Sequence, residues 1–126
     1  ASELGPDATI TTIERDPDSA RIAEQNIIGS NIRPTVKVVI GDAIEVLPHI
    51  RGQFDLVFID ADKHEYLRYL REIEDKIHAG SLVVADNARV CASQMRNYLG
   101  YVRTSGRYRS QFIPIDWDGL EVSVKL

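Results

Sequence analysis

The stretch from Phe54 to Lys63, FDLVFIDADK, constrains the fold of this chain more than any other. It begins with a run of apolar residues and ends in Asp60, Asp62 and Lys63. A short apolar run between polar residues is typical of a strand that is buried on both faces of a parallel sheet. Ligands of open α/β sheets bind beyond the carboxyl ends of such strands, so the three charged residues predict a site. The alternative is that Asp60 or Asp62 only caps the following helix.

Strand-like and helix-like segments alternate along the chain. Runs rich in β-branched and other apolar residues predict strands at 8–14, 35–40, 54–59 and 82–85. Helical spacing and capping residues predict helices between and after them, at 16–29, 43–50, 66–78 and 93–99. Two closing strands, 108–114 and 120–126, form a hairpin through residues 116–119, where an Asp-Gly step favours a tight turn. This order predicts an α/β fold with a mostly parallel sheet and a C-terminal antiparallel hairpin at its edge.

The composition is that of one globular domain. The chain has 126 residues, of which 44% are hydrophobic, enough to bury a core. Its formal net charge of −4 argues against broad nucleic-acid binding. A single cysteine excludes an internal disulfide and fits a reducing cytoplasm. No apolar run approaches the ~20 residues of a membrane span, so we expect no membrane partner and a cytoplasmic location.

Acidic residues end or follow most of the predicted strands. They are Glu14, Asp42, Asp60 and Asp86. The ends of parallel strands meet at one edge of a sheet, so these carboxylates are expected to converge there. At the start of a strand-to-helix connection, Glu14 is well placed to accept hydrogen bonds from ribose hydroxyls. The alternative is a solvated carboxylate that favours the N-terminus of the next helix.

Asp60, Asp86 and Asn87 form a second set, because all three offer oxygen ligands. Two carboxylates and an amide oxygen suit Mg²⁺ or Ca²⁺ better than zinc, which prefers histidine and cysteine. Asp86-Asn87 is also a common way to begin a turn after a strand. The spacing therefore leaves both a metal site and a plain turn open.

Lys63 follows Asp60 by three residues. A partly desolvated lysine beside a metal can lose its proton near neutral pH and act as a general base. A surface lysine in the first turn of a helix is the simpler alternative, although the helix dipole disfavours it there.

A small basic cluster lies near the C-terminus and consists of Arg103, Arg107 and Arg109. A solvated edge is its ordinary interpretation. Contact with a phosphate group is the sharper alternative.

Five segments spread over nearly the whole chain carry a more specific pattern. They are TTIERDPDSARIAEQN, VVIGDAIEVLP, FDLVFIDADKHEY, GSLVVADN and DGLEVSVK. In sequence and order they resemble the cation-dependent O-methyltransferases that use S-adenosylmethionine, a family that includes catechol and caffeoyl-CoA O-methyltransferases. The pair FIDADK and VVADN is the most specific part. The resemblance implies a Rossmann-like class I methyltransferase fold.

The resemblance also implies a role for each matching residue. Glu14 would hold the ribose of S-adenosylmethionine, and Asp42 and Ala43 would lie beside its adenine. Mg²⁺ or another divalent cation would be bound by Asp60, Asp86 and Asn87, with Asp60 also near the amino group of the cofactor. Lys63 would be the general base.

The implied activity is methyl transfer to a hydroxyl of a small vicinal-diol aromatic or acyl-CoA-like acceptor. The resemblance implies a homodimer for the full-length protein. One alternative is an O-methyltransferase acting on hydroxylated uridine in tRNA, which the net charge disfavours and the arginine cluster weakly favours. Another is a non-catalytic binding or assembly domain that keeps the fold.

Two departures from the family pattern accompany these matches. The glycine-rich motif of the first strand is absent. We therefore expect residues 1–126 to be the C-terminal part of a single methyltransferase domain, with the first strand and the N-terminal helices missing. The second departure is Phe112, which takes the position of an acidic residue in the catechol-specific enzymes and argues against a catecholamine acceptor.

Overall fold

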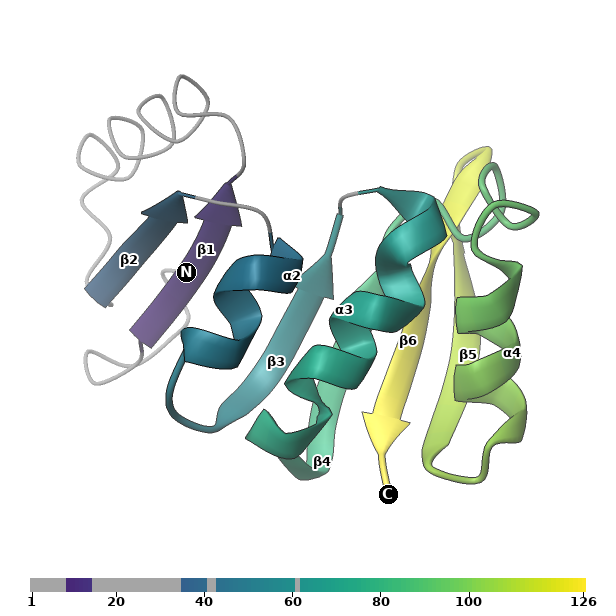
Figure 1. The fold of residues 1–126 in the computed structure, drawn as a ribbon. Helices are drawn as coiled ribbons and strands as arrows, with labels where there is room; N and C mark the ends of the chain where they lie inside the picture. Colours follow the sequence, from purple (N-terminus) through teal and green to yellow (C-terminus); the bar gives the residue numbers. More distant parts are fainter. Residues whose placement is uncertain (1–8, 15–34, 41–42, 61) are drawn as a thin grey trace. The chain divides into compact units, whose positions relative to one another are not determined.

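The computed structural model of the chain describes residues 9–14, 35–40, 43–60 and 62–126. The chain divides into two compact units, Ala1–His49 and Ile50–Leu126. The described strands form one sheet in each unit (Figure 1).

The first unit contains a parallel pair of strands, as the β-branched runs predict. β1 (Thr9–Glu14) pairs with β2 (Thr35–Ile40) along its whole length, from Thr9 opposite Thr35 to Glu14 opposite Ile40. The short helix predicted at 43–50 is present as α2 (Ala43–Val46), which continues as the 3-10 turn η1 (Leu47–His49). The helix predicted at 16–29 lies outside the described residues.

The second unit contains a four-stranded sheet in the order β3-β4-β6-β5. β3 (Phe54–Ile59) is parallel to β4 (Ile77–Ala85), and β4 is antiparallel to β6 (Asp118–Lys125). β5 (Tyr108–Ile115) pairs with β6 and closes the sheet on that side. This arrangement confirms the predicted hairpin at the edge of the sheet.

The turn of this hairpin differs from the prediction. Ile115 pairs with Asp118, so Asp116 and Trp117 form the loop, and Asp116 takes the left-handed conformation with φ 53°. The Asp-Gly step lies inside β6 instead. A Cβ atom on Gly119 would lie 2.6 Å from the carbonyl oxygen of Ile113 and would also collide with the ring of Phe112. Glycine is therefore required at 119 by a cross-strand contact rather than by the turn.

The amphipathic segment after β3 ends earlier than its periodicity predicts. It forms η2 (Lys63–Glu65), α3 (Tyr66–Ile73) and η3 (Glu74–Lys76), and Ile77 already belongs to β4. The Ser81 hydroxyl accepts a hydrogen bond from the amide of His78 at 3.0 Å and donates one to the carbonyl of Phe54 at 2.8 Å. These bonds fasten residues 77–81 to β3, so the predicted extension of the helix to residue 78 is wrong.

α4 (Arg96–Thr104) begins three residues later than predicted and extends five residues further. Residues 88–95 form hydrogen-bonded turns instead, for example through the Met95 amide, which donates to the Cys91 carbonyl at 3.1 Å. The buried side chains of Tyr98, Leu99 and Val102 hold the helix on the sheet beyond the predicted end. No helix in the described part of the chain is long and apolar enough to span a lipid bilayer.

The core of the second unit lies between the sheet and the two helices α3 and α4, which cover the same face (Figure 1). Its fully buried apolar and aromatic side chains include Tyr66, Leu70, Val83, Met95 and Tyr98. The Tyr66 and Tyr98 rings meet edge to face, with centroids 5.8 Å apart, where α3 and α4 pack. Such aromatic pairs stabilise packing beyond the area that they bury.

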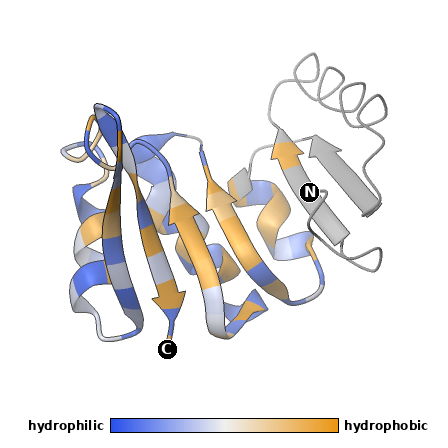
Figure 2. Ribbon diagram, turned by 180° about the vertical axis from the view of Figure 1, so that it is seen from behind, coloured by the Kyte–Doolittle hydropathy of each residue, from blue (hydrophilic) through white to orange (hydrophobic). Residues whose placement is uncertain are grey.

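The opposite face of the sheet is uncovered in the described part of this unit. Leu56 and Phe58 of β3 are each 59% exposed, and Leu82, which pairs with Leu56, is 39% exposed. Figure 2 views this face, with apolar residues of β3 and β4 in front and the helices behind. The prediction that 54–59 is buried on both faces is therefore wrong for this structure, because α3 and α4 pack on one side only.

A buried polar network joins α4 to the hairpin. Glu121 of β6 is fully buried, and the Arg103 guanidinium donates to both of its carboxylate oxygens, at 2.8 and 3.0 Å. The Ser110 hydroxyl also donates to Glu121, at 2.6 Å, and exchanges a hydrogen bond with Ser123 at 2.7 Å. Buried charges are tolerated when they are paired and hydrogen-bonded in this way.

Tyr98 lies close to this network, but its hydroxyl contributes little to the stability of the fold. The hydroxyl is buried and makes no well-formed hydrogen bond among the residues that the structure describes, although the Ser123 hydroxyl lies near enough to lower the pKa of Tyr98 slightly. Burial raises the pKa of Tyr98, and the charge of Glu121 raises it further. An unsatisfied buried hydroxyl costs free energy that a phenyl ring avoids.

We expect Tyr98→Phe to leave the free energy of unfolding unchanged or to raise it by up to about 1 kcal/mol, as measured by chemical denaturation. Tyr108→Phe is the matched control, since the Tyr108 hydroxyl donates to Glu74 at 2.9 Å. Loss of that charged hydrogen bond should cost about 1.5 to 3 kcal/mol. Equal losses in the two variants would contradict the assignment of an unpaired Tyr98 hydroxyl.

Candidate active site

The carboxyl ends of β3 and β4 bring together the acidic residues that the sequence predicts there. Ile59 and Ala85 are partners in the parallel register, and the Asp86 amide continues the ladder by donating to the Ile59 carbonyl at 3.1 Å. Asp60 and Asp86 therefore start from neighbouring backbone positions on strands that lie about 4.8 Å apart. The Asp60 side chain is 55% exposed and remains open to solvent.

Asn87 lies directly after Asp86 in an unusual backbone conformation, with φ 63°. Its amide N–H donates to Oδ1 of Asp86 at 2.8 Å. Its side-chain Nδ2 donates to Oδ2 of Asp118 at 2.8 Å, and this hydrogen bond lowers the pKa of Asp118. Residues with short polar side chains tolerate the left-handed region best, so asparagine suits this position.

Asp62, rather than Asp60, caps the helical segment that follows β3. The Asp62 carboxylate accepts a hydrogen bond from the amide of His64 at 3.0 Å, at the N-terminus of η2. Of the two capping alternatives that the sequence leaves open, the structure contains the one at Asp62. Asp60 is left with a different partner, the side chain of Lys63.

Lys63 is held between a carboxylate and a phenol. Its Nζ donates to Oδ1 of Asp60 at 3.2 Å and to the hydroxyl of Tyr66 at 2.5 Å, and its side chain is only 14% exposed. Burial lowers the pKa of Lys63, but the hydrogen bonds and charges of Tyr66 and Asp60 outweigh it, so the pKa lies above 10.5. The prediction for Lys63 concerns a lysine beside a bound metal, so its role as a general base stays a prediction.

Two of the residues predicted to bind the cofactor are described in the first unit. Glu14 is the last residue of β1, as predicted, and Ala43 is the first residue of α2. Asp42 lies outside the described residues.

The oxygen donors of Asp60, Asp86 and Asn87 fit a hard divalent cation by their chemistry. Within the described ranges, no three histidine, cysteine, aspartate or glutamate side chains gather in a metal-binding group. The set at the strand ends has two carboxylates and takes its third ligand from an amide. Mg²⁺ in proteins is commonly held by one or two carboxylates, with water and substrate completing its shell.

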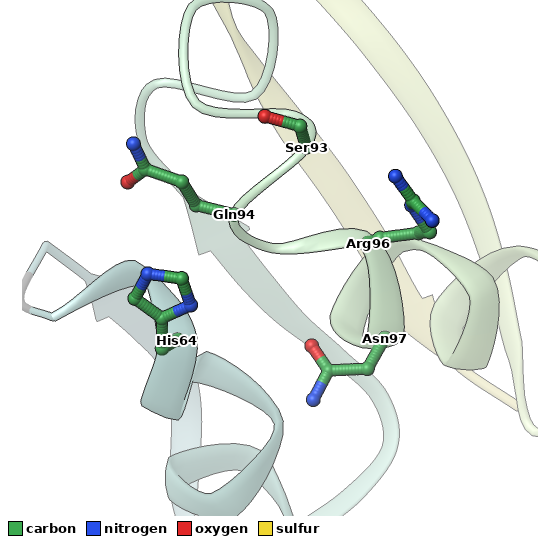
Figure 3. Close-up of a pocket in the computed structure, with 5 residues that line it drawn as sticks. All are labelled: His64, Ser93, Gln94, Arg96 and Asn97. Carbon is green, nitrogen blue, oxygen red and sulfur yellow. The ribbon is translucent and has the colours of Figure 1, made fainter.

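A separate hollow has a volume of about 490 Å³, and none of the predicted cation ligands lines it. The residues that line it have polar side chains and come from two segments (Figure 3): His64 of η2, and Ser93, Gln94, Arg96 and Asn97 around the start of α4. The sequence does not predict this grouping, because His64 is about thirty residues from the other four.

The predicted arginine cluster is divided by the structure. Arg103 is paired with the buried Glu121, whereas Arg107 and Arg109 are exposed and have no such buried carboxylate partner in the described part of the chain. Arg103 is also partly exposed, but the Glu121 carboxylate compensates the charge that phosphate contact would need. Phe112 is half-buried, with the Arg89 guanidinium 5.1 Å from its ring centroid.

Sequence reasoning overlooked two residues that touch the site. Tyr66 binds Lys63, and Asp118 binds Asn87. Tyr66 follows Lys63 by three residues, a helical spacing that brings side chains together and could have indicated the contact. Asp118 is 31 residues from Asn87, and nothing local indicates that pair.

Comparison with known proteins gives consistent matches. The family model described as O-methyltransferase matches residues 1–96. The catechol O-methyltransferase of Mycobacterium tuberculosis is 37% identical over 88 residues, which cover 69% of this chain and 40% of that protein. The catechol O-methyltransferase of Sus scrofa is 31% identical over 134 residues, covering 96% of this chain and 71% of that protein.

The fold has a close counterpart among solved structures. The crystal structure of cofactor-bound Rv0187 from MTB matches with a TM-score of 0.85 and 27% identity, covering 93% of this chain and 61% of that one. The chain thus spans less than two thirds of that structure and 40% of the mycobacterial relative. Together with the family match, this likeness confirms the predicted methyltransferase fold.

Proposed function

Since this chain belongs to the O-methyltransferase family, we propose that it serves methyl transfer from S-adenosylmethionine to a hydroxyl group, with a divalent cation bound at the site. The acceptor that we propose is a small vicinal-diol aromatic or acyl-CoA-like molecule. The observation that carries the proposal is the junction of Asp60, Asp86 and Asn87 at neighbouring strand ends, with Lys63 hydrogen-bonded to Asp60.

The proposed cation ligands are Asp60, Asp86 and Asn87. When bound, such a cation supplies a Lewis acid that lowers the pKa of a coordinated hydroxyl group. Asp60 is the most exposed of the three and leaves room for an acceptor beside it. A vicinal diol suits this arrangement because its two oxygens can occupy neighbouring coordination positions.

Lys63 is the proposed general base. In the cation-free chain its pKa is raised, so the ammonium is protonated at neutral pH. The pKa of Lys63 would fall once the Asp60 carboxylate is engaged by a cation, because like charges repel and the stabilising partner is taken up. Tyr66 would keep the amine in place during proton transfer, since its hydroxyl is 2.5 Å from Nζ.

The cofactor contacts that we propose follow the family resemblance. Glu14 would accept hydrogen bonds from the ribose hydroxyls, as the carboxylate at a strand end does in nucleotide-binding folds. Asp42 and Ala43 would lie by the adenine, and Asp60 near the amino group of the methionine part. Backbone N–H groups at the start of α2 would suit a polar edge of the base.

Removal of divalent cations is expected to lower methyl transfer about 100-fold or more, because a Lewis acid supplies several kcal/mol of stabilisation. The assay uses the full-length gene product, S-adenosylmethionine and 3,4-dihydroxybenzoate, with and without excess EDTA. Excess Mg²⁺ should restore the rate. Transfer at full rate in the presence of the chelator would remove the cation from the mechanism.

A binding measurement separates catalysis from the non-catalytic alternative. Calorimetric titration with S-adenosylmethionine should show a saturable site in the full-length protein. If no cofactor binds, the protein is better explained as a binding or assembly domain with the same fold. tRNA that carries hydroxyuridine but lacks its methyl group, from a strain lacking the gene, is the second acceptor to assay, and methylation of tRNA alone would replace the small-molecule acceptor.

A further inference from the structure

Asp118 fastens the connection after β4 to the start of β6. Its Oδ2 accepts from Nδ2 of Asn87 at 2.8 Å, and its Oδ1 accepts from the amides of Arg89 and Val90, each at 3.2 Å. The amide of Gly119 donates to the same Oδ1 at 2.9 Å. A single carboxylate thus closes residues 87–90 onto the hairpin.

The hydrogen bond from Asn87 to Asp118 fixes which end of the amide faces the hairpin. A carboxylate accepts hydrogen bonds and cannot donate them, so Asn87 must present its NH₂ group to Asp118. The carbonyl oxygen of the amide then points away from Asp118. Within the described residues, this Oδ1 accepts no hydrogen bond and is available as a ligand.

We propose that Asp118 is a positioning residue that orients Oδ1 of Asn87 toward the cation. The inference rests on the proposed function, because it concerns the same cation site. Residues that hydrogen-bond to a metal ligand typically change the metal affinity by about 10- to 100-fold.

The substitution Asp118→Asn separates orientation from loop closure. The new carbonyl oxygen can still accept the hydrogen bonds of Arg89, Val90 and Gly119. The new NH₂ group, however, would face the NH₂ group of Asn87, and two donors cannot pair. The side-chain amide of Asn87 is expected to flip, so that its Oδ1 accepts a hydrogen bond from residue 118. This oxygen then no longer faces the cation.

The test is Mg²⁺ binding to the full-length protein by isothermal titration calorimetry, with the melting temperature of each cation-free variant recorded beside it. Asp118→Asn should bind Mg²⁺ about 10- to 100-fold more weakly while its melting temperature shows that it is still folded at the temperature of the titration. Asp116→Asn is the matched control, because it makes the same charge change in the adjoining loop and Asp116 has no hydrogen bond to Asn87. It should bind like the wild type.

A double variant provides the rescue. In Asn87→Asp with Asp118→Asn, the new amide at 118 can donate to the new carboxylate at 87, which keeps another oxygen for the cation. Binding should return to within about threefold of the wild type, which is less than 1 kcal/mol. Wild-type affinity in Asp118→Asn, or weak binding that the double variant does not restore, overturns the inference. If the wild type itself binds no Mg²⁺, the proposed cation site fails first and the role of Asp118 falls with it.

Discussion

Replacement of Lys63 by alanine is expected to lower turnover about 100- to 10,000-fold while leaving the affinity for S-adenosylmethionine nearly intact. A positioned general base contributes this range, and Nζ of Lys63 lies 3.2 Å from the carboxylate of Asp60. The measurement is the methyl-transfer rate at saturating cofactor, together with calorimetric cofactor binding. An unchanged rate would remove Lys63 from the mechanism.

Two further variants isolate the proton transfer from the positive charge. Lys76→Ala is the matched control, since Lys76 is also 14% exposed and paired with an aspartate, Asp75. It should keep the wild-type rate. Lys63→Arg retains a cation beside Asp60 but cannot give up a proton near neutral pH. It should be nearly as slow as Lys63→Ala; a fast arginine variant would indicate that Lys63 acts only through its charge.

The ion pair of Lys63 also contributes to stability, in a defined range of pH. The folded-state pKa is raised above its unfolded-state value, so the contribution is fully present below the unfolded-state pKa. It is lost as the pH rises through the raised value, because the amine then becomes neutral in the folded protein as well.

The substitution Arg103→Ala is expected to lower the free energy of unfolding by about 3 kcal/mol, as measured by denaturant titration. It would leave the fully buried carboxylate of Glu121 without its bidentate cation. The value is taken from the low end of the range for buried pairs because the Arg103 side chain is 45% exposed.

Arg109→Ala gives the comparison, because Arg109 is an exposed residue of the same basic stretch. Exposed substitutions usually change stability by no more than about 0.5 kcal/mol. The addition of Glu121→Gln to Arg103→Ala should recover part of the loss, since it removes the unpaired charge. Equal small effects in the two arginine variants would show that the buried pair is not a stabilising contact.

The strands and their charged ends were predictable because local chemistry decides them. β2 and β3 have the predicted bounds, 35–40 and 54–59, since each is mostly β-branched or apolar, with a single charged residue in it. Asp60 and Asp86 followed from the same logic, because the ends of parallel strands meet at one edge. A family resemblance added the identity of the chemistry, which strand ends alone do not specify.

The failures share a different cause, which is contact between residues distant in sequence. Ile77 has helical spacing from Ile73, yet Ser81 binds the backbone of Phe54 and places that segment in a strand. Arg103 has the character of a surface residue by type, and its partner is 18 residues away. Burial of Leu56 and Phe58 depends on what covers a whole face, which an apolar run does not specify.

β6 carries both Asp118, which binds the connection after β4, and Glu121, which binds α4. β6, the connection after β4 and α4 are therefore expected to unfold locally as one cooperative unit. Release of β6 from β4 would free Asn87 and expose the charge of Glu121 in the same event. The release of Asn87, the proposed cation ligand, and the loss of the contact that holds α4 are thus expected to be one opening reaction, with one free energy.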